Sequence, residues 1–214
     1  MIEQIKRKIP HAWRLYAFRK KFHKKFQTKV FPANIFDCTC IGKIGKHSYG
    51  PIEVYTWGAE NEKLEIGNFV SVANDVTFVL GGNHSMDRLS TYPFALDFKD
   101  FPMERPESKG PIIIEDDVWI GMKSTIMSGV TIHQGAVIMS GSIVTQDIPA
   151  YAIAGGIPAK IVKYRFEEPV RQMLVEKLDW EQWDDDQIIE WRQQLGKTIE
   201  SEEQVREILE TIKK

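Results

Sequence analysis

The sequence predicts a mainly-β protein built around a parallel β-helix, a stack of short strands wound around one apolar interior. Two observations predict it: aliphatic residues recur every six positions, and a second, mostly small residue recurs four positions after each of them. The flanking segments lack this repeat. We therefore divide the chain into a basic helical arm at 1–34, the β-helix at 35–165 with a long excursion loop at 83–110, and C-terminal helices at 166–214.

Six consecutive hexads carry the repeat. Their first positions are Ile114, Ile120, Ile126, Ile132, Ile138 and Val144, and their fifth positions are Val118, Ser124, Val130, Ala136, Ser142 and Ile148. The same frame includes Ile66, Val72 and Phe78, and an earlier hexad begins at Ile44. A period of six fits neither an α-helix nor alternation along a hairpin. We expect each hexad to form one strand and one corner, with the large residue inside, the small one where the chain turns, and Gly, Asn or Asp at the bend.

The N-terminal arm is strongly basic. Residues 1–29 hold ten Lys/Arg and one acid, a charge of +9 that leaves −11 on the remainder. Two apolar series recur at helical spacing: Ile5, Ile9, Trp13 and Tyr16, and Leu15, Phe18, Phe22 and Phe26. They predict one or two amphipathic helices ending before Pro32. Such a helix packs on its own body or a partner subunit, or lies on a membrane through residues 2–29. No reader motif accompanies the charge, so a nucleic-acid partner is not expected.

The pattern becomes helical again after Lys163. Its apolar positions are Val170, Met173, Leu174 and Leu178, followed by Ile188, Ile189 and Leu195. Asp184 with Gln187, and Ser201 with Gln204, have the spacing of capping boxes that start two helices. We expect this tail to cap the β-helix or to cover a neighbouring subunit.

Cys38 and Cys40 are the two cysteines, and their spacing lacks the second pair that a structural zinc site needs. We expect packed, reduced thiols and no metal requirement. No apolar run reaches membrane-spanning length, and the first residues are too charged for a secretory signal. These features predict a cytoplasmic protein, and the basic arm adds the inner membrane surface as a location.

Four motifs occur in a fixed order: Asn83-His84-Ser85-Met86-Asp87, Ser90-Thr91-Tyr92-Pro93-Phe94, Asp117-Val118-Trp119-Ile120-Gly121 and Ala154-Gly155-Gly156-Ile157-Pro158-Ala159-Lys160. Through them, residues 40–195 resemble the hexapeptide-repeat acyltransferases. The match is to the xenobiotic acetyltransferase branch, which includes streptogramin and chloramphenicol acetyltransferases, and to polysaccharide O-acetyltransferases. This resemblance implies a left-handed β-helix with three strands per coil, a homotrimer, and active sites shared between adjacent subunits.

Transfer of an acyl group from a thioester to a hydroxyl needs a base for the attacking alcohol, and histidine suits that task near neutral pH. Among five histidines, His84 stands at the root of the excursion, and the resemblance assigns it the role of general base. We expect His133 to point into solvent and His47 to be structural. The chain has no G-x-S-x-G motif, and neither cysteine has a local base, so direct transfer without a covalent intermediate is predicted.

The resemblance also implies acetyl-CoA as the acyl donor. The matching positions are Trp119 near the acetyl group, Met122, Ser140, Thr145 and Gln146 along the donor, and Lys160 and Lys163 near its phosphates. Gln146 replaces a lysine that relatives often carry, which puts one phosphate contact in doubt. On the acceptor side the matching positions are Tyr49, Asn83 and Met86.

Two acceptors stay open. Antibiotic-modifying relatives share Ser48, Tyr49 and the His84 loop, whereas the arm and residues 54–58 look more like the branch associated with surface-polysaccharide biosynthesis. A basic aromatic arm also suits an acceptor carried on a membrane lipid, so a sugar hydroxyl is favoured over an antibiotic hydroxyl. A third hypothesis, from another class, is a non-catalytic trimeric β-helix that serves as a binding module.

Overall fold

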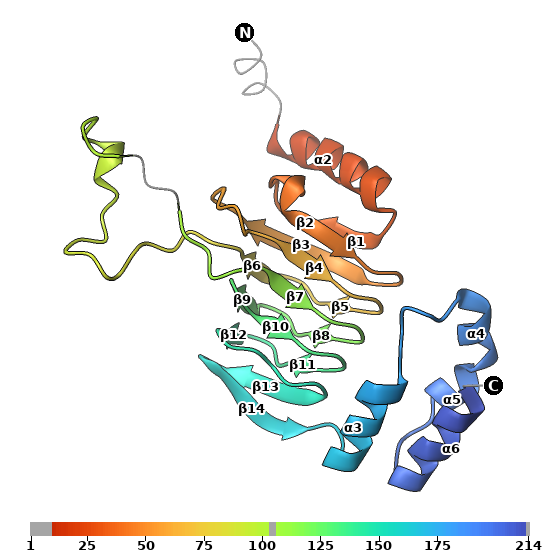
Figure 1. Cartoon of the computed structure of the whole chain (residues 1–214). Helices are drawn as coiled ribbons and strands as arrows, with labels where there is room; N and C mark the ends of the chain where they lie inside the picture. The colour runs from red at the N-terminus through yellow and green to blue at the C-terminus, as the bar shows by residue number, and fades with distance from the viewer. Residues whose placement is uncertain (1–9, 103–105, 213–214) are drawn as a thin grey trace. The chain divides into compact units, whose positions relative to one another are not determined.

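The structure is a computed structural model that describes residues 10–102 and 106–212. The chain forms two compact units, Met1–Lys163 and Tyr164–Lys214, and each is described by itself. The first unit is the parallel β-helix that the hexads predict, with its strands stacked coil upon coil in Figure 1.

Three strand faces surround the interior. Face A contains β1 (Lys29–Pro32), the start of β3 (Tyr49–Tyr55), β5 (Ser71–Val72), β8 (Trp119–Ile120), β11 (Val137–Ile138) and β13 (Ala152–Gly156), with β14 (Ala159–Tyr164) beside β13. Face B contains β2 (Ile41–Ile44), β4 (Leu64–Ile66), β7 (Ile112–Ile114) and β10 (Thr131–Ile132). Face C contains the end of β3, then β6 (Thr77–Val79), β9 (Thr125–Met127) and β12 (Ile143–Val144). The chain visits B, A and C in turn, so one coil has three strands.

The strand register confirms the repeat. Ile114 pairs with Ile132 on face B, and Ile120 pairs with Ile138 on face A, so successive coils are three hexads apart. Across the excursion, Phe78 still pairs with Ile126. The insertion therefore leaves the register of the coils above and below it in phase.

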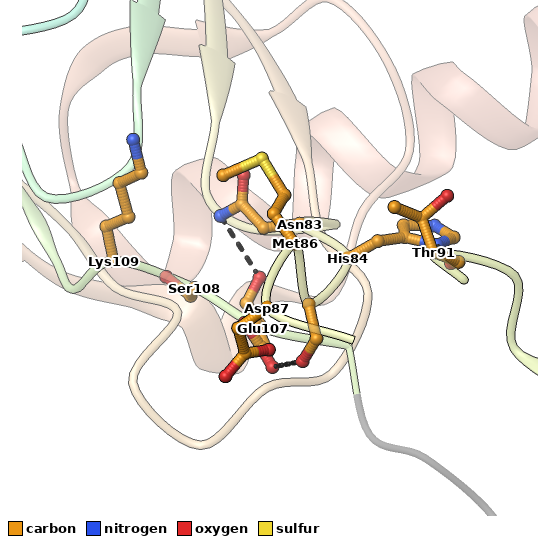
Figure 2. A pocket seen from close by; sticks show the side chains of 9 residues that line it. Asn83, His84, Met86, Asp87, Thr91, Glu107, Ser108 and Lys109 are labelled. Atoms are coloured by element: carbon orange, nitrogen blue, oxygen red, sulfur yellow. Dashed lines mark hydrogen bonds between the residues drawn. The ribbon is translucent and has the colours of Figure 1, made fainter. Parts of the chain in front are cut away.

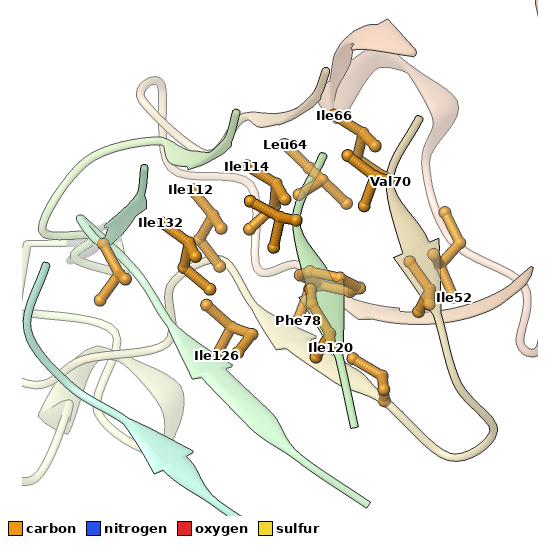
Figure 3. Packing of buried hydrophobic residues seen from close by; sticks show 14 of the residues in the cluster. Ile52, Leu64, Ile66, Val70, Phe78, Ile112, Ile114, Ile120, Ile126 and Ile132 are labelled. Atoms are coloured by element: carbon orange, nitrogen blue, oxygen red, sulfur yellow. The ribbon is translucent and has the colours of Figure 1, made fainter. Parts of the chain in front are cut away.

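The first and fifth positions of the hexads point inward, and together they form the apolar core. Figure 3 shows side chains from the three faces meeting in this interior. Three fifth positions are serines, Ser48, Ser124 and Ser142, and each hydroxyl donates a hydrogen bond to a backbone carbonyl at a corner. A buried serine is tolerated there because its hydroxyl has a partner.

In most hexads the fourth position forms the corner and has a left-handed backbone. Glycine occupies it at Gly129, Gly135 and Gly141, where a positive φ has little steric cost. His47, Phe69 and Lys123 adopt the same conformation although their side chains disfavour it. The expectation of Gly, Asn or Asp at the bend is thus correct for part of the stack. At the other corners, tertiary packing imposes the left-handed backbone on residues that disfavour it.

The sixth hexad departs from the predicted frame. Ile148, expected at a fifth position, instead forms a parallel bridge with Ile132 on face B, so this coil is two residues short. Asp147 makes the shortening possible, because its carboxylate accepts a hydrogen bond from the Thr131 backbone N–H at 2.7 Å. Tyr151 then turns the next corner, buried with its ring over Gly135.

The basic arm contributes helix α2 (His11–Phe26), and β1 follows within the region assigned to the arm. Phe22 is buried and packs against Phe26 and Phe36, with ring centroids 4.7 and 6.1 Å away. Because β1 pairs with β3, sheet pairing begins before residue 35, earlier than the sequence predicts. Ile5 and Ile9 lie outside the described residues. In the described chain, no helix combines the length and the apolar character needed to cross a bilayer.

The second unit contains α3 (Glu168–Lys177), α4 (Asp185–Glu190), α5 (Arg192–Leu195) and α6 (Glu202–Ile212). The capping box at Asp184 is confirmed, since its carboxylate and the Gln187 side chain each accept a backbone N–H. The second box is half formed: the Gln204 N–H donates to the Ser201 hydroxyl, but the Gln204 side chain accepts from Glu200. The role of this unit as a cap stays a prediction.

Both cysteines are free thiols packed beside the core. Burial raises the pKa of the Cys40 thiol to about 12 from its ordinary value of 9.0, and burial also raises the pKa of Cys38. Neither thiol is therefore a ready nucleophile at neutral pH.

We expect the native protein to resist alkylation of Cys40 by iodoacetamide at mildly alkaline pH, whereas the denatured chain reacts at both cysteines. Because the folded pKa of Cys40 lies above the unfolded one, the folded state retains a proton that the unfolded state loses. The free energy of unfolding should therefore fall as the pH rises above about 9 toward about 12, and this fall should be smaller in Cys40→Ala. Rapid labelling of native Cys40 would contradict the packed arrangement.

Candidate active site

The excursion is anchored where it leaves and rejoins the β-helix. Asn83 and Glu107 form an antiparallel bridge, with backbone hydrogen bonds of 3.0 and 3.1 Å in the two directions. The Ser108 hydroxyl donates to the Leu80 carbonyl at 2.6 Å, which ties the returning chain to the end of β6. The two ends of the excursion are thus bonded to each other, and His84 is its first residue beyond that bridge.

The His84 ring is oriented by the backbone of the excursion. Its Nδ1 lies 2.6 Å from the Thr91 carbonyl oxygen, and Figure 2 shows the two residues side by side. A carbonyl oxygen can only accept, so Nδ1 carries the hydrogen in the neutral ring and Nε2 keeps its lone pair. The imidazole is exposed and held in the tautomer that a general base requires.

An open pocket of about 790 Å³ surrounds this ring. Its lining residues are Asn83, His84, Ser85, Met86, Asp87, Thr91, Glu107, Ser108 and Lys109. Most of these side chains carry hydroxyl, amide or charged groups, and the Ser85 hydroxyl donates to the Glu107 carboxylate. The pocket therefore offers both hydrogen-bond donors and acceptors beside the His84 ring, with the exposed thioether of Met86 as an apolar contact.

The tip of the excursion is aromatic. Phe94 contacts Tyr92, Phe98 and Phe101, with ring centroids 5.3, 6.1 and 5.2 Å away. A hydrogen bond to Asp97 raises the pKa of Tyr92. These contacts give the loop a small apolar cluster of its own, separate from the residues of the main core.

Glu62 and Trp57, which were not predicted from the sequence, support the start of the excursion. The buried carboxylate of Glu62 accepts hydrogen bonds of 2.9 Å from the backbone N–H groups of Trp57 and Gly58. The Trp57 ring covers Gly82, where a Cβ atom would lie 2.7 Å from the indole. Gly81 likewise lies against the Glu62 carboxylate. The pair of glycines before Asn83 was the one sequence signal of this close approach.

We expect Gly82→Ala to lower the transfer rate about 10²-fold, because the added Cβ collides with Trp57 and shifts the backbone that places His84. Gly58→Ala is the matched control: Gly58 also has a positive φ, of 88°, but nothing lies within 4 Å of its added Cβ. It should cost about 1 kcal/mol of stability and leave the rate near that of the unaltered chain. The two variants are compared by steady-state rates and thermal melting. Equal rates would show that the contact between Gly82 and Trp57 does not position His84.

Three residues that the resemblance matches to the donor come together near one corner of the coils. Trp119 lies half-exposed on β8 of face A, with Met122 at the corner that follows. Ser140 stands at the same corner one coil further, where the Gly141 N–H donates to the Met122 carbonyl at 2.8 Å. Gly121 fits beneath Ser140, since an added Cβ would lie 2.6 Å from the Ser140 nitrogen.

The other donor positions lie further along the stack. Thr145 and Gln146 are exposed and follow β12, and Lys160 and Lys163 are exposed on β14. Among the residues described, no group of three or more His, Cys, Asp or Glu side chains has the arrangement of a metal site.

His84 and the corner formed by Met122 and Ser140 lie near opposite ends of β9. Met122 precedes β9, whereas Ser128, which follows it, lies 3.4 Å from the Asn83 amide nitrogen. A strand of three residues spans about 10 Å, so one chain keeps His84 apart from Met122 and Ser140. The acceptor positions also separate: Asn83 and Met86 line the His84 pocket, but Tyr49 lies on face A in the row that continues to Trp119.

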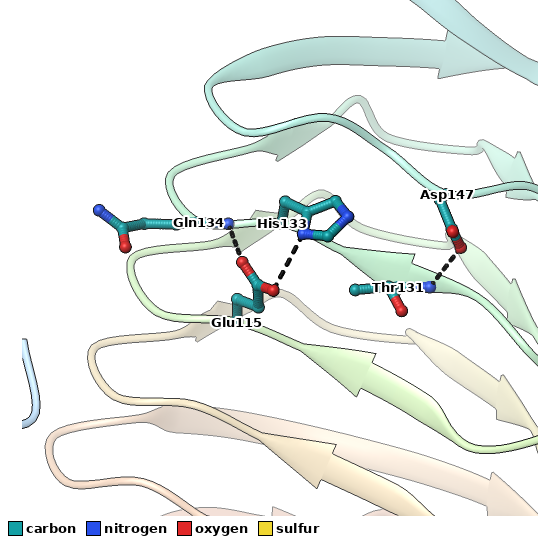
Figure 4. A network of polar contacts seen from close by, with 5 residues as sticks. All are labelled: Glu115, Thr131, His133, Gln134 and Asp147. Atoms are coloured by element: carbon teal, nitrogen blue, oxygen red, sulfur yellow. Dashed lines mark hydrogen bonds and ion pairs between the residues drawn. The ribbon is translucent and has the colours of Figure 1, made fainter. Parts of the chain in front are cut away.

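Two further histidines, His47 and His133, have structural contacts. His47 stacks on Phe69 with ring centroids 5.0 Å apart, as a structural role predicts. His133 does not simply point into solvent as predicted: its Nδ1 lies 2.9 Å from Glu115, whose second oxygen accepts the Gln134 N–H at 2.8 Å (Figure 4). The half-buried pair links two coils of face B, because Glu115 stands one coil before His133.

Comparison with known proteins agrees with this architecture. Residues 111–146 match the family described as bacterial transferase hexapeptide (six repeats). A probable macrolide acetyltransferase from Lysinibacillus sphaericus is 38% identical over 60% of this chain and 74% of its own length. A chloramphenicol acetyltransferase from Klebsiella aerogenes is 38% identical over 57% of this chain and 60% of its own length, so the match spans less than two thirds of that relative.

Solved structures show the same fold. A hexapeptide-repeat acetyltransferase from Vibrio cholerae, in complex with acetyl coenzyme A, superposes with a TM-score of 0.51 and 25% identity over 71% of this chain and 79% of its own. A maltose O-acetyltransferase from Clostridium difficile superposes with a TM-score of 0.52 and 26% identity over 70% and 75% of the two chains. These neighbours imply left-handed winding of the coils. The chain therefore belongs to the hexapeptide-repeat acetyltransferases.

Proposed function

We propose that this protein transfers the acetyl group of acetyl-CoA to a hydroxyl of a small molecule or glycan, with His84 as the general base. The observation that carries the proposal is the contact between His84 Nδ1 and the Thr91 carbonyl, which leaves Nε2 ready to accept a proton. As the hydroxyl oxygen attacks the thioester carbon, its proton passes to Nε2 and a C–O bond forms. The C–S bond then breaks, and the proton passes from His84 to the thiolate of coenzyme A.

The donor site proposed here uses Trp119 near the acetyl group and Met122, Ser140, Thr145 and Gln146 along the pantetheine. Lys160 and Lys163 supply positive charge to the nucleotide phosphates, and both are exposed on β14. Gln146 offers an amide where a lysine would add a charge. The Vibrio cholerae neighbour, which binds acetyl coenzyme A, supports this choice of donor.

A homotrimer would complete the site. Within one chain, His84 and the Met122 corner lie near opposite ends of strand β9. A neighbouring β-helix can bring its own Met122 corner beside the His84 pocket. We therefore propose that each active site joins His84 and Asn83 of one subunit to the donor residues of the next.

A sugar hydroxyl is the acceptor that we favour. The hydroxyl, amide and carboxylate groups around His84 match the many donors and acceptors of a sugar, and one structural neighbour is a maltose O-acetyltransferase. In this proposal the sugar belongs to a surface polysaccharide or to its precursor. An antibiotic hydroxyl is the second candidate, because the curated relatives are macrolide and chloramphenicol acetyltransferases.

Release of free thiol from acetyl-CoA, measured with a panel of sugars, macrolides, streptogramins and chloramphenicol, tests both candidates. We expect turnover with a sugar to exceed turnover with each antibiotic in kcat/KM. The opposite order would replace the sugar by the antibiotic as acceptor. No acceptor-dependent thiol release by a chain that binds acetyl-CoA would favour the non-catalytic binding module.

A further inference from the structure

Helix α2 has two different faces. Phe22 is buried against the β-helix, and Arg19 and Lys25 turn toward the same body, where they donate to the carbonyls of Pro32 and Cys38. Each residue of an α-helix turns the chain by about 100°. Trp13, nine positions before Phe22, therefore faces directly away from the body, and Lys20 and Lys24 flank that direction.

The outward face is aromatic at its start and cationic at its end. Trp13 and Tyr16 are 67% and 63% exposed and meet edge to face, with ring centroids 6.3 Å apart. Lys20, Lys21 and Lys24 are exposed in the following turns. The helix contains no acidic residue. Two large aromatic side chains thus stay in water although the helix has a packed apolar face elsewhere.

We infer that the outward face of α2 binds the surface of an anionic lipid bilayer. Indole and phenol rings are stable at the boundary between headgroups and acyl chains, and lysines beside them attract anionic headgroups. An acidic protein surface would match the charge but would leave the exposed rings unexplained. Unpaired bases of a single-stranded nucleic acid can stack on such rings, but no nucleic-acid-binding motif accompanies these lysines, so this ligand is kept as an outcome of the test. Figure 1 places α2 across the end of the β-helix, with β1 and β2 on its inner side. This inference does not depend on the acetyl acceptor.

Sedimentation of the full-length protein with lipid vesicles tests the inference. We expect binding to vesicles that contain about one third phosphatidylglycerol, weaker binding at high salt, and little binding to pure phosphatidylcholine. Lys20→Gln combined with Lys24→Gln should weaken binding about 30-fold, since each lysine near an anionic surface contributes about fivefold. Trp13→Ala should weaken binding while leaving its salt dependence unchanged, because it removes an apolar contact.

The matched control is Lys177→Gln combined with Lys197→Gln, which removes two exposed charges from the second unit. Circular dichroism should show that every variant retains its fold. If the control pair weakens vesicle binding as much as the α2 pair does, net charge alone explains the effect and the inference is overturned. Absence of binding to phosphatidylglycerol vesicles would overturn it as well, including the case in which the protein binds single-stranded nucleic acid through the same lysines.

Discussion

His84→Ala is expected to lower kcat by about 10²–10⁴-fold, the usual contribution of a positioned general base. The KM for acetyl-CoA should change little, because the contacts proposed for the donor are made by other residues, such as Trp119, Met122 and Ser140. The fold should be unaffected, since the imidazole is exposed and contacts a loop carbonyl. Initial rates at saturating acetyl-CoA, with thermal melting alongside, measure these effects.

The control for this variant is His133→Ala. His133 is a half-exposed histidine on the same β-helix, paired with Glu115, and its loss removes an imidazole at a site away from the pocket. Its rate should equal that of the unaltered chain. Added imidazole should restore part of the His84→Ala rate by entering the open pocket. If His84→Ala keeps a normal rate, another group deprotonates the hydroxyl and the assignment of the base is wrong.

Phe78→Ala is expected to reduce the free energy of unfolding by about 3–5 kcal/mol, the cost of emptying a buried aromatic site. Phe78 is fully buried on β6, paired with Val54 on one side and Ile126 on the other. A unit of this size should melt on the order of 10 °C lower. Because β6 leads directly into the root of the excursion, the variant should also lose activity at temperatures where the coil loosens.

Val79→Ala is the control on the same strand. Val79 is the next residue of β6, faces outward and is half-buried, so its truncation leaves no internal cavity. It should shift the melting temperature much less than Phe78→Ala does. Equal shifts would show that the inward and outward faces of β6 are not distinguished as the hexads predict. Thermal denaturation followed by circular dichroism gives both values.

Much of the β-helix is predictable from the sequence because one constraint recurs in every coil. Each first position must fill the same interior, so Ile114, Ile120 and Ile126 repeat without interruption and identify the strands. The shortened coil could not be predicted, because Asp147 compensates for two missing residues by bonding to a backbone group in another coil. The pairing of β1 was missed for a similar reason, since its partner β3 lies some twenty residues further along the chain.

For the candidate site, the sequence supplies the proposed general base but not the contacts that support it. His84 was identified by a motif, and the structure adds the carbonyl that selects its tautomer. The buried carboxylate of Glu62 has no neighbouring pattern in the sequence, because its partners are backbone N–H groups and its role depends on the ring of Trp57. Tyr49 and Asn83 are both matched to the acceptor, but Tyr49 lies on face A whereas Asn83 lines the His84 pocket. A site assembled from several coils is visible in a sequence only where a motif marks it.

The bridge between Asn83 and Glu107 allows the sequence of the excursion to change without changing the β-helix. With Asn83 and Glu107 already bonded to each other, residues between them can be lengthened, shortened or replaced while the coils above and below keep their register. The entropic free-energy cost of closing a loop rises slowly with its length, by about 0.6 kcal/mol for each doubling. If the His84 pocket binds the acceptor as proposed, selection on the acceptor can act on the excursion while the β-helix stays constant, and related chains with one scaffold can diverge toward hydroxyls as different as those of sugars and antibiotics.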